Sequence, residues 1–198
     1  MPKPTLLFVL SVAAAATGGA ALETASRAAA QTRLPLVNVP EPAPRPAPSW
    51  KNTSWLNADR PQTLESLRGR VVLLNFWTFT CYNCRNAIPS LVTFDRTYRE
   101  RGLTVIGIHT PEFPPYAGEH DRANVAKALK EQGIEYPNAQ DNDSKTWDLY
   151  RIRYWPSYVL IDRRGEIRYE GYGEFHLGDA HHQLWDQRIR ALLEEDEQ

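Results

Sequence analysis

The stretch VVLLNFWTFTCYNC, residues 71–84, contains both cysteines of this 198-residue chain. Its first half, Val71–Trp77, is a nearly continuous run of aliphatic and aromatic residues, which predicts a central strand that is buried on both faces. Cys81 and Cys84 follow, with two residues between them. A disulfide that closes so short a loop restricts the unfolded chain very little and therefore adds little stability. We expect the pair to serve chemistry rather than structure.

The residues after the cysteines have the pattern of a helix. Apolar side chains recur at helical spacing across residues 85–101, and Gly102 suits the end of such a helix. Backbone amides and the positive end of the dipole at a helix N-terminus favour a thiolate over a thiol. We therefore expect Cys81 to be the exposed nucleophile that attacks a substrate disulfide. Cys84, one turn further on, would then attack Cys81 and release the product from a mixed disulfide.

The rest of the chain alternates between strand and helix patterns. The predicted elements are a strand at 103–109, a helix at 119–133, a short strand at 135–141, a short helix at 145–150, a hairpin around the turn 163–165 and a final helix at 179–194. With the first strand and helix, the order is β-α-β-α-β-α, then a β-hairpin, then a helix. Parallel crossovers followed by an antiparallel hairpin predict an α/β fold with a mixed central sheet and helices on both faces.

The N-terminus has the features of an export signal. Lys3 is followed by an uncharged apolar run at residues 6–16, and AAAQ at residues 28–31 offers a cleavage site. We interpret residues 1–30 as a signal peptide, with an uncleaved membrane anchor as the alternative. The protein is therefore expected to be exported to the periplasm or cell envelope.

A proline-rich segment follows the signal. Residues 31–49 carry prolines at alternate positions from Pro40 to Pro48, a density that favours extended polyproline II, so we interpret them as a semi-rigid linker. Residues 50–198 are long enough for one domain with its own core. The formal net charge is −1 with both signs mixed along the chain, and we expect no nucleic-acid partner.

Several motifs together resemble a known family. NFWTFTCYNC at residues 75–84, GIHTPEF at 107–113, DND at 141–143 and YWPSYVLID at 154–162 are similar to the exported thioredoxin-fold proteins of the TlpA-like group, and within it to the C-terminal redoxin domain of the DipZ type. The similarity runs over residues 64–173. It implies a thioredoxin fold with an extra β-α insertion after the first β-α-β unit.

The resemblance also assigns roles to single residues. Pro156 matches the cis-proline that lies against the thiols, and the backbone of Trp155 would pair with a bound substrate strand. Pro89 matches a helix-kinking proline; such a position otherwise costs a helix about 3 kcal/mol. Asn75 departs from the family pattern, because thioredoxin has a buried acid there. An amide cannot take the proton from Cys84, so another base is needed.

Glu112 is our predicted base. It follows directly from the second predicted strand, on the edge where a parallel sheet gathers its active-site loops. It is flanked by Pro111 and Phe113, and we expect these apolar neighbours to desolvate the carboxylate and raise its pKa.

Aromatic residues surround the cysteines. We expect Phe76 to belong to the core. The others are expected to bind substrate, as an apolar rim on which an unfolded or partner polypeptide docks: Trp77, Phe79, Tyr82 and Trp155.

The residue pattern is compatible with two alternative functions. The cysteines could bind copper or zinc with a histidine, as in thioredoxin-fold copper chaperones, and the available imidazoles are His176, His181 and His182. A thiol peroxidase is the other alternative, because Thr78 stands three residues before Cys81 as in peroxiredoxins. Leu74 stands where that family needs a proline. We expect no metal and no cofactor beyond the redox-active disulfide.

The resemblance further implies partners. The TlpA-like proteins are mostly reductants, so we expect protein thiols and disulfides of the cell envelope as substrates and a membrane electron donor that recharges the cysteines. Export compartments are oxidising, and a reductant there needs such a donor.

Overall fold

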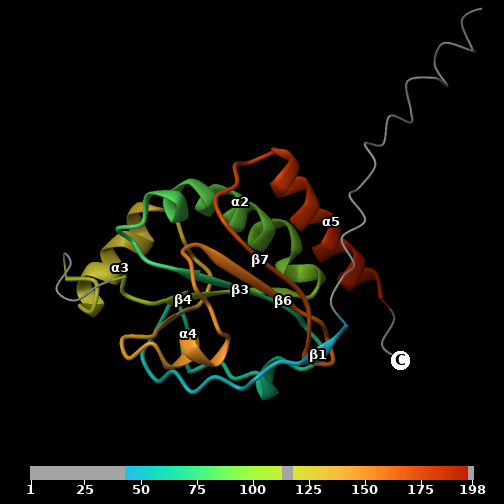
Figure 1. Cartoon of the computed structure of the whole chain (residues 1–198), viewed down its shortest axis with the longest axis horizontal. Helices are drawn as coiled ribbons and strands as arrows, with labels where there is room; N and C mark the ends of the chain where they lie inside the picture. The colour runs from blue at the N-terminus through green and yellow to red at the C-terminus, as the bar shows by residue number, and fades with distance from the viewer. Residues whose placement is uncertain (1–42, 113–117, 196–198) are drawn as a thin grey trace, which may run out of the picture. The chain divides into compact units, whose positions relative to one another are not determined.

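The computed structural model describes residues 43–112 and 118–195 (Figure 1). The order of elements predicted from residue 71 onward is confirmed. The elements are β1 (Arg45–Pro46), β2 (Trp55–Leu56), the 3-10 turn η1 (Glu65–Leu67), β3 (Val71–Trp77), α2 (Tyr82–Tyr98), the 3-10 turn η2 (Arg99–Arg101), β4 (Leu103–His109), α3 (Arg122–Glu131), β5 (Asn138–Gln140), α4 (Lys145–Leu149), β6 (Ser157–Ile161), β7 (Glu166–Tyr172) and α5 (Ala180–Glu194).

The strands form one mixed sheet in the order β1-β7-β6-β3-β4-β5-β2. β3 lies at its centre, parallel to β4 and antiparallel to β6. The parallel register runs from the pair Val71 and Leu103 to the pair Trp77 and His109. The carboxyl ends of β3 and β4 therefore lie side by side, and the residues that follow each strand meet at one edge of the sheet.

The two faces of the sheet carry separate cores. Residues of β3 alternate between them, as the period of a strand requires. Leu73 and Trp77 pack in the same cluster as Cys84 of α2, whereas Leu74 and Phe76 pack in the opposite cluster. Figure 1 shows α2 and α5 on one face of the sheet and α4 on the other. The predicted placement of Phe76 in the core is confirmed, since its side chain is fully buried.

The last part of the proline-rich segment belongs to the domain. Arg45 and Pro46 pair with the start of β7, and the backbone amide of Ala47 donates to the Gly165 carbonyl over 2.9 Å. The Tyr150 hydroxyl donates to the carbonyl of Pro48 over 2.8 Å. A proline fits this place because an edge strand does not need every amide. The predicted boundary at residue 50 was therefore too late, and residues 31–42 lie outside the described part.

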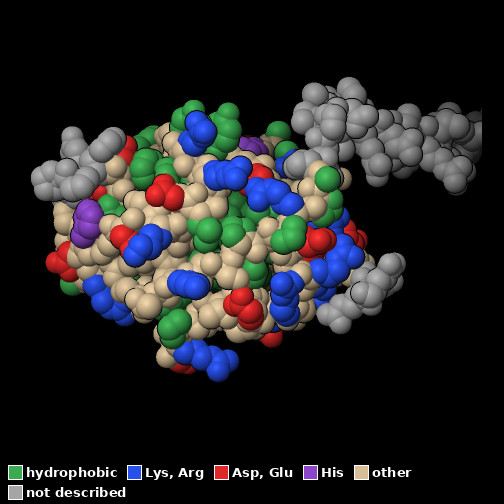
Figure 2. Space-filling model, turned by 60° about the horizontal axis from the view of Figure 1, so that its bottom comes forward, with side chains coloured by type: hydrophobic (Ala, Val, Ile, Leu, Met, Phe, Trp, Pro, Cys, Tyr) green, Lys and Arg blue, Asp and Glu red, His purple; other side chains and the backbone are tan. Residues whose placement is uncertain are grey.

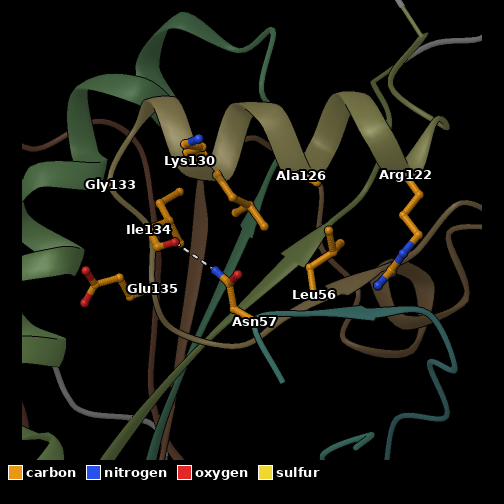
Figure 3. A pocket seen from close by; sticks show the side chains of 9 residues that line it. Leu56, Asn57, Arg122, Ala126, Lys130, Gly133, Ile134 and Glu135 are labelled. Atoms are coloured by element: carbon orange, nitrogen blue, oxygen red, sulfur yellow. Dashed lines mark hydrogen bonds between the residues drawn. The ribbon is translucent and has the colours of Figure 1, made fainter. Parts of the chain in front are cut away.

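The end of the sheet near β2 is held by polar contacts. The Asn57 amide donates to the Ile134 carbonyl over 2.8 Å, and Arg122 donates to the Trp55 carbonyl over 2.6 Å. A cavity of about 590 Å³ lies between β2 and α3 (Figure 3). None of the residues that line it comes from the cysteine-bearing segment.

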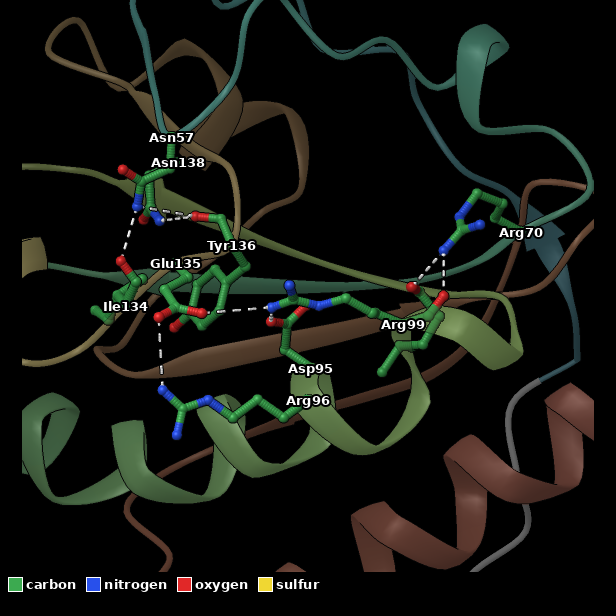
Figure 4. Close-up of polar contacts among 10 residues, drawn as sticks. Asn57, Arg70, Asp95, Arg96, Arg99, Ile134, Glu135, Tyr136 and Asn138 are labelled. Atoms are coloured by element: carbon green, nitrogen blue, oxygen red, sulfur yellow. Dashed lines mark hydrogen bonds and ion pairs between the residues drawn. The ribbon is translucent and has the colours of Figure 1, made fainter.

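The C-terminal end of α2 is held by a second group of polar contacts (Figure 4). Arg99 pairs with Asp95 one turn earlier, and Glu135 pairs with Arg96 across 3.7 Å. The Arg70 guanidinium donates to the backbone carbonyl of Arg99 over 2.9 Å. The helix that carries the cysteines is thereby fixed at its far end.

Charges of both signs are interspersed over the face of the molecule seen in Figure 2. Among the residues that the structure describes, no helix has the length and apolar character needed to span a bilayer. The predicted signal segment lies outside those residues.

Candidate active site

The two cysteines lie where β3 gives way to α2. They form a disulfide with 5.3 Å between their Cα atoms. Cys81 is the N-cap of α2, and its sulfur accepts a hydrogen bond from the backbone amide of Cys84 over 3.1 Å. Cys81 is partly exposed, whereas Cys84 is only 1% exposed. The geometry matches the expected division between an accessible nucleophile and a buried partner.

This difference in access predicts the order of chemical modification. After reduction, Cys81 should react with iodoacetamide at least about ten-fold faster than Cys84, because a thiol needs both exposure and thiolate character to react. Graded labelling followed by peptide mass spectrometry measures both rates. Faster labelling of Cys84 would contradict the assignment of roles.

A fully buried carboxylate lies beside the cysteine-bearing loop. One oxygen of Glu119, Oε1, accepts hydrogen bonds from the hydroxyls of Thr78, over 2.5 Å, and of Thr80. The other oxygen, Oε2, accepts from the backbone amide of Glu112 over 2.9 Å. Glu119 therefore joins the loop that ends at Cys81 to the segment that follows β4.

A buried imidazole lies next to this carboxylate. His109 Nε2 is 3.3 Å from the Thr78 hydroxyl and accepts from the Phe79 amide over 3.4 Å. The ring stacks on Phe79 with 5.5 Å between centroids. Burial lowers the pKa of His109 to about 4, although the charge of Glu119 acts in the opposite direction. His109 is therefore neutral at pH 7.

The loop before β6 completes the site. The Trp155–Pro156 peptide bond is cis, as the resemblance implied. The Trp155 indole donates to the Thr110 carbonyl over 3.1 Å and stacks on Trp147 at 4.0 Å. The Pro156 carbonyl accepts from the amide of Gly173 over 2.9 Å. Trp155 is partly buried, so part of its surface remains open to a partner.

The predicted aromatic rim is only partly present. Tyr82 is 66% exposed, and Phe79 is half-buried against His109. The prediction for Trp77 was wrong, because this side chain is fully buried and its indole donates to the Asn138 side chain over 2.9 Å. Trp77 is the last residue of β3 and still points into the helix-covered core.

Glu112 lies at the predicted edge, directly after β4, but its side chain is exposed. The expected burial of this carboxylate was wrong. The buried acid that contacts the cysteine-bearing loop is Glu119, seven residues later, which was not predicted. The only sequence signal was a second carboxylate beside a histidine in the same connection, and nothing in the residue pattern distinguishes the two.

The remaining predicted groups have other surroundings. Asn75 is buried on the α2 side of β3. The His176 imidazole lies 2.7 Å from the Glu174 carboxylate, and His182 stacks on Phe94 at 4.6 Å. Within residues 43–112 and 118–195, no group of three or more His, Cys, Asp and Glu side chains is placed to hold a metal ion. The Thr78 hydroxyl donates to Glu119 rather than facing outward beside Cys81.

The fold and the cysteine pair define the class, a thioredoxin-like thiol-disulfide oxidoreductase. The chain belongs to the AhpC/TSA family, which residues 44–170 match.

Named relatives point to the same class. The chain is 46% identical to protein DipZ of Mycobacterium tuberculosis over 150 residues. The aligned region covers 74% of this chain and 20% of DipZ. The chain thus spans about a fifth of the length of that relative. It is 27% identical to the thiol-disulfide oxidoreductase YkuV of Bacillus subtilis, with 73% of this chain and 90% of YkuV covered.

Solved structures have the same fold. A thiol-disulfide isomerase from Corynebacterium glutamicum superposes with a TM-score of 0.64 at 27% identity, covering 76% of this chain and 98% of the other. A DsbE-like thiol:disulfide interchange protein from Chlorobium tepidum superposes with a TM-score of 0.65 at 24% identity, covering 76% and 96%.

Proposed function

We propose that this domain is an exported reductant of protein disulfides that works through a mixed disulfide. The thiolate of Cys81 attacks one sulfur of a substrate disulfide; the substrate S–S bond breaks and one substrate thiolate leaves. The thiolate of Cys84 then attacks Cys81, and the second substrate thiolate leaves. Two electrons pass to the substrate, and the domain is left with the Cys81–Cys84 disulfide. A membrane-bound dithiol donor reverses that oxidation in the cell envelope.

One observation carries this proposal. The partly exposed sulfur of Cys81 caps α2, where backbone amides favour a thiolate, and the buried Cys84 is bonded to it. The bound polypeptide would lie against Trp155, Phe79 and Tyr82, which are at least partly open to solvent, with the buried Pro156 directly behind Trp155.

The proposal is tested by adding the reduced domain to insulin in stoichiometric amount. We expect the insulin disulfides to be reduced while the domain becomes oxidised, and we expect Cys81→Ser to do neither. An inactive wild-type domain, or an active Cys81→Ser variant, would contradict the proposal.

We propose Glu112 as the proton acceptor for Cys84. Its backbone is fixed by Glu119 at the edge where β3 and β4 end. Glu112→Gln keeps the shape of the side chain and removes its basicity. Because the carboxylate is exposed and water can compete with it, we expect release of the mixed disulfide to slow by about 10²-fold, the low end for general-base catalysis.

Single-turnover kinetics against pH measure this release step. Glu131→Gln, which removes an exposed carboxylate from α3, is the control and should behave as wild type. An unchanged release rate in Glu112→Gln would show that water, and not Glu112, accepts the proton of Cys84.

A further inference from the structure

The buried carboxylate of Glu119 has no role in the exchange steps themselves, yet it is hydrogen-bonded to the loop that ends at the reacting cysteine. Its side chain is 0% exposed. The Thr80 hydroxyl that donates to it belongs to the residue directly before Cys81, and consecutive Cα atoms lie only about 3.8 Å apart. The carboxylate of Glu119 is thus one hydrogen bond and one residue away from Cys81.

The contacts of Glu119 suit an ionised carboxylate. Two hydroxyls and one backbone amide all donate to its oxygens, and an ionised carboxylate is an acceptor only. The neighbouring His109 is neutral at pH 7 and brings no compensating charge.

A negative charge on Glu119 and the N-terminus of α2 have opposite effects on the thiolate of Cys81. The N-terminus of α2 favours the thiolate of Cys81, whereas a buried anion nearby disfavours it, and the side chain of Glu119 is shielded from bulk solvent. The N-terminus of α2 and the charge of Glu119 therefore act on the same sulfur in opposite directions.

We propose that Glu119 is a positioning residue with two effects. It holds the loop at residues 78–81 against the backbone of Glu112, and its charge makes the Cys81–Cys84 disulfide harder to reduce. A stabilised dithiol makes a strong oxidant, as in DsbA, so a group that destabilises the thiolate of Cys81 makes the dithiol a better electron donor. This inference rests on the proposed function and gives a physical reason for the direction of electron flow.

Glu119→Gln tests the role of the charge, since the amide keeps the size and most of the hydrogen bonds. We expect the pKa of Cys81 to fall by about one unit, measured from the pH dependence of alkylation. We measure the reaction of the protein disulfide with two glutathione thiols, which gives the protein dithiol and glutathione disulfide, at a pH above the pKa of Cys81 in both proteins. There the equilibrium constant should rise about 10-fold, because the dithiol form is then stabilised by the full shift in pKa. That change corresponds to about 30 mV in reduction potential.

Two control variants separate charge from loop geometry. Glu131→Gln loses an exposed charge on α3 and should keep the wild-type potential. Thr80→Val removes one hydrogen bond to Glu119 but keeps the charge of Glu119. The loop at residues 78–81 should then be held less firmly, while the reduction potential shifts by less than in Glu119→Gln. Glu119→Ser is a second neutral variant in case Glu119→Gln does not fold, and the same direction of change is expected.

The outcomes are distinct from those of the functional test. If Glu119→Gln or Glu119→Ser shows the wild-type pKa of Cys81 and the wild-type equilibrium, or if Thr80→Val shifts both as much as the neutral variants do, the inference is overturned and the proposed function stands. If the wild-type domain does not reduce insulin, the proposed function itself fails.

Discussion

Cys84→Ser is expected to convert the domain from a catalyst with turnover into a trap. Cys81 remains at the N-terminus of α2 and can still attack a substrate disulfide, but the buried thiol that releases the product is gone. We expect multiple turnover to be lost and a stable mixed disulfide to accumulate, with one substrate molecule on Cys81. Intact-protein mass spectrometry before and after treatment with dithiothreitol measures the adduct.

Cys81→Ser is the matched control for this experiment, because it keeps a single thiol of the same pair. It should form no adduct, since Cys84 is 1% exposed. Adducts of equal yield in both variants would mean that either thiol can attack, and the proposed division of roles would then be wrong.

Acid is expected to destabilise the domain through His109. Burial lowers the pKa of this imidazole to about 4, from about 6.5 in an unfolded chain. The unfolded state therefore takes up a proton at higher pH than the folded state does. The stability from a neutral His109 is present above about pH 6.5 and is lost as the pH falls through about 4. With 1.36 kcal/mol per pKa unit, the loss is about 3 kcal/mol.

Urea unfolding of the oxidised domain at several pH values between 7 and 4 measures this loss. His109→Gln should remove about 3 kcal/mol of the decrease in the free energy of unfolding, whatever its stability at pH 7. His120→Gln, at an exposed position in the same connection, should keep the wild-type dependence. An equal decrease in wild type and His109→Gln would show that other groups cause the acid sensitivity.

The sequence predicts the part of the site that depends on local pattern. A buried strand, a CxxC motif and a helix follow each other without interruption over residues 71–98, so the position of Cys81 at a helix N-terminus needs no knowledge of distant contacts. The cis bond at Pro156 was predicted from a resemblance, and spacing alone would not indicate it.

The placement of the carboxylates could not be predicted in the same way. Glu112 and Glu119 lie on one connection, and which of them is buried depends on how the connection folds back on the hydroxyls of Thr78 and Thr80. That contact spans about forty residues, and no local periodicity encodes it. Trp77 was misplaced for a related reason, because its indole is held by Asn138 on β5, two strands away.

The short strand β1 shows the same limitation. Proline-rich composition predicts an extended chain, and Arg45 and Pro46 are indeed extended, but they pair with the free edge of β7. The partner of an edge strand is set by the tertiary fold. Composition therefore predicts the extended conformation of these residues but not their pairing with β7.

The reduction potential of the Cys81–Cys84 pair tests the central claim most directly. The domain is equilibrated with glutathione buffers of defined ratio, and the fraction of dithiol is measured after rapid alkylation. We predict that both cysteines convert together in one two-electron transition, at a potential nearer to the roughly −270 mV of thioredoxin than to the roughly −120 mV of DsbA. Cysteines that react independently of each other, or a potential near that of DsbA, would contradict a disulfide reductant.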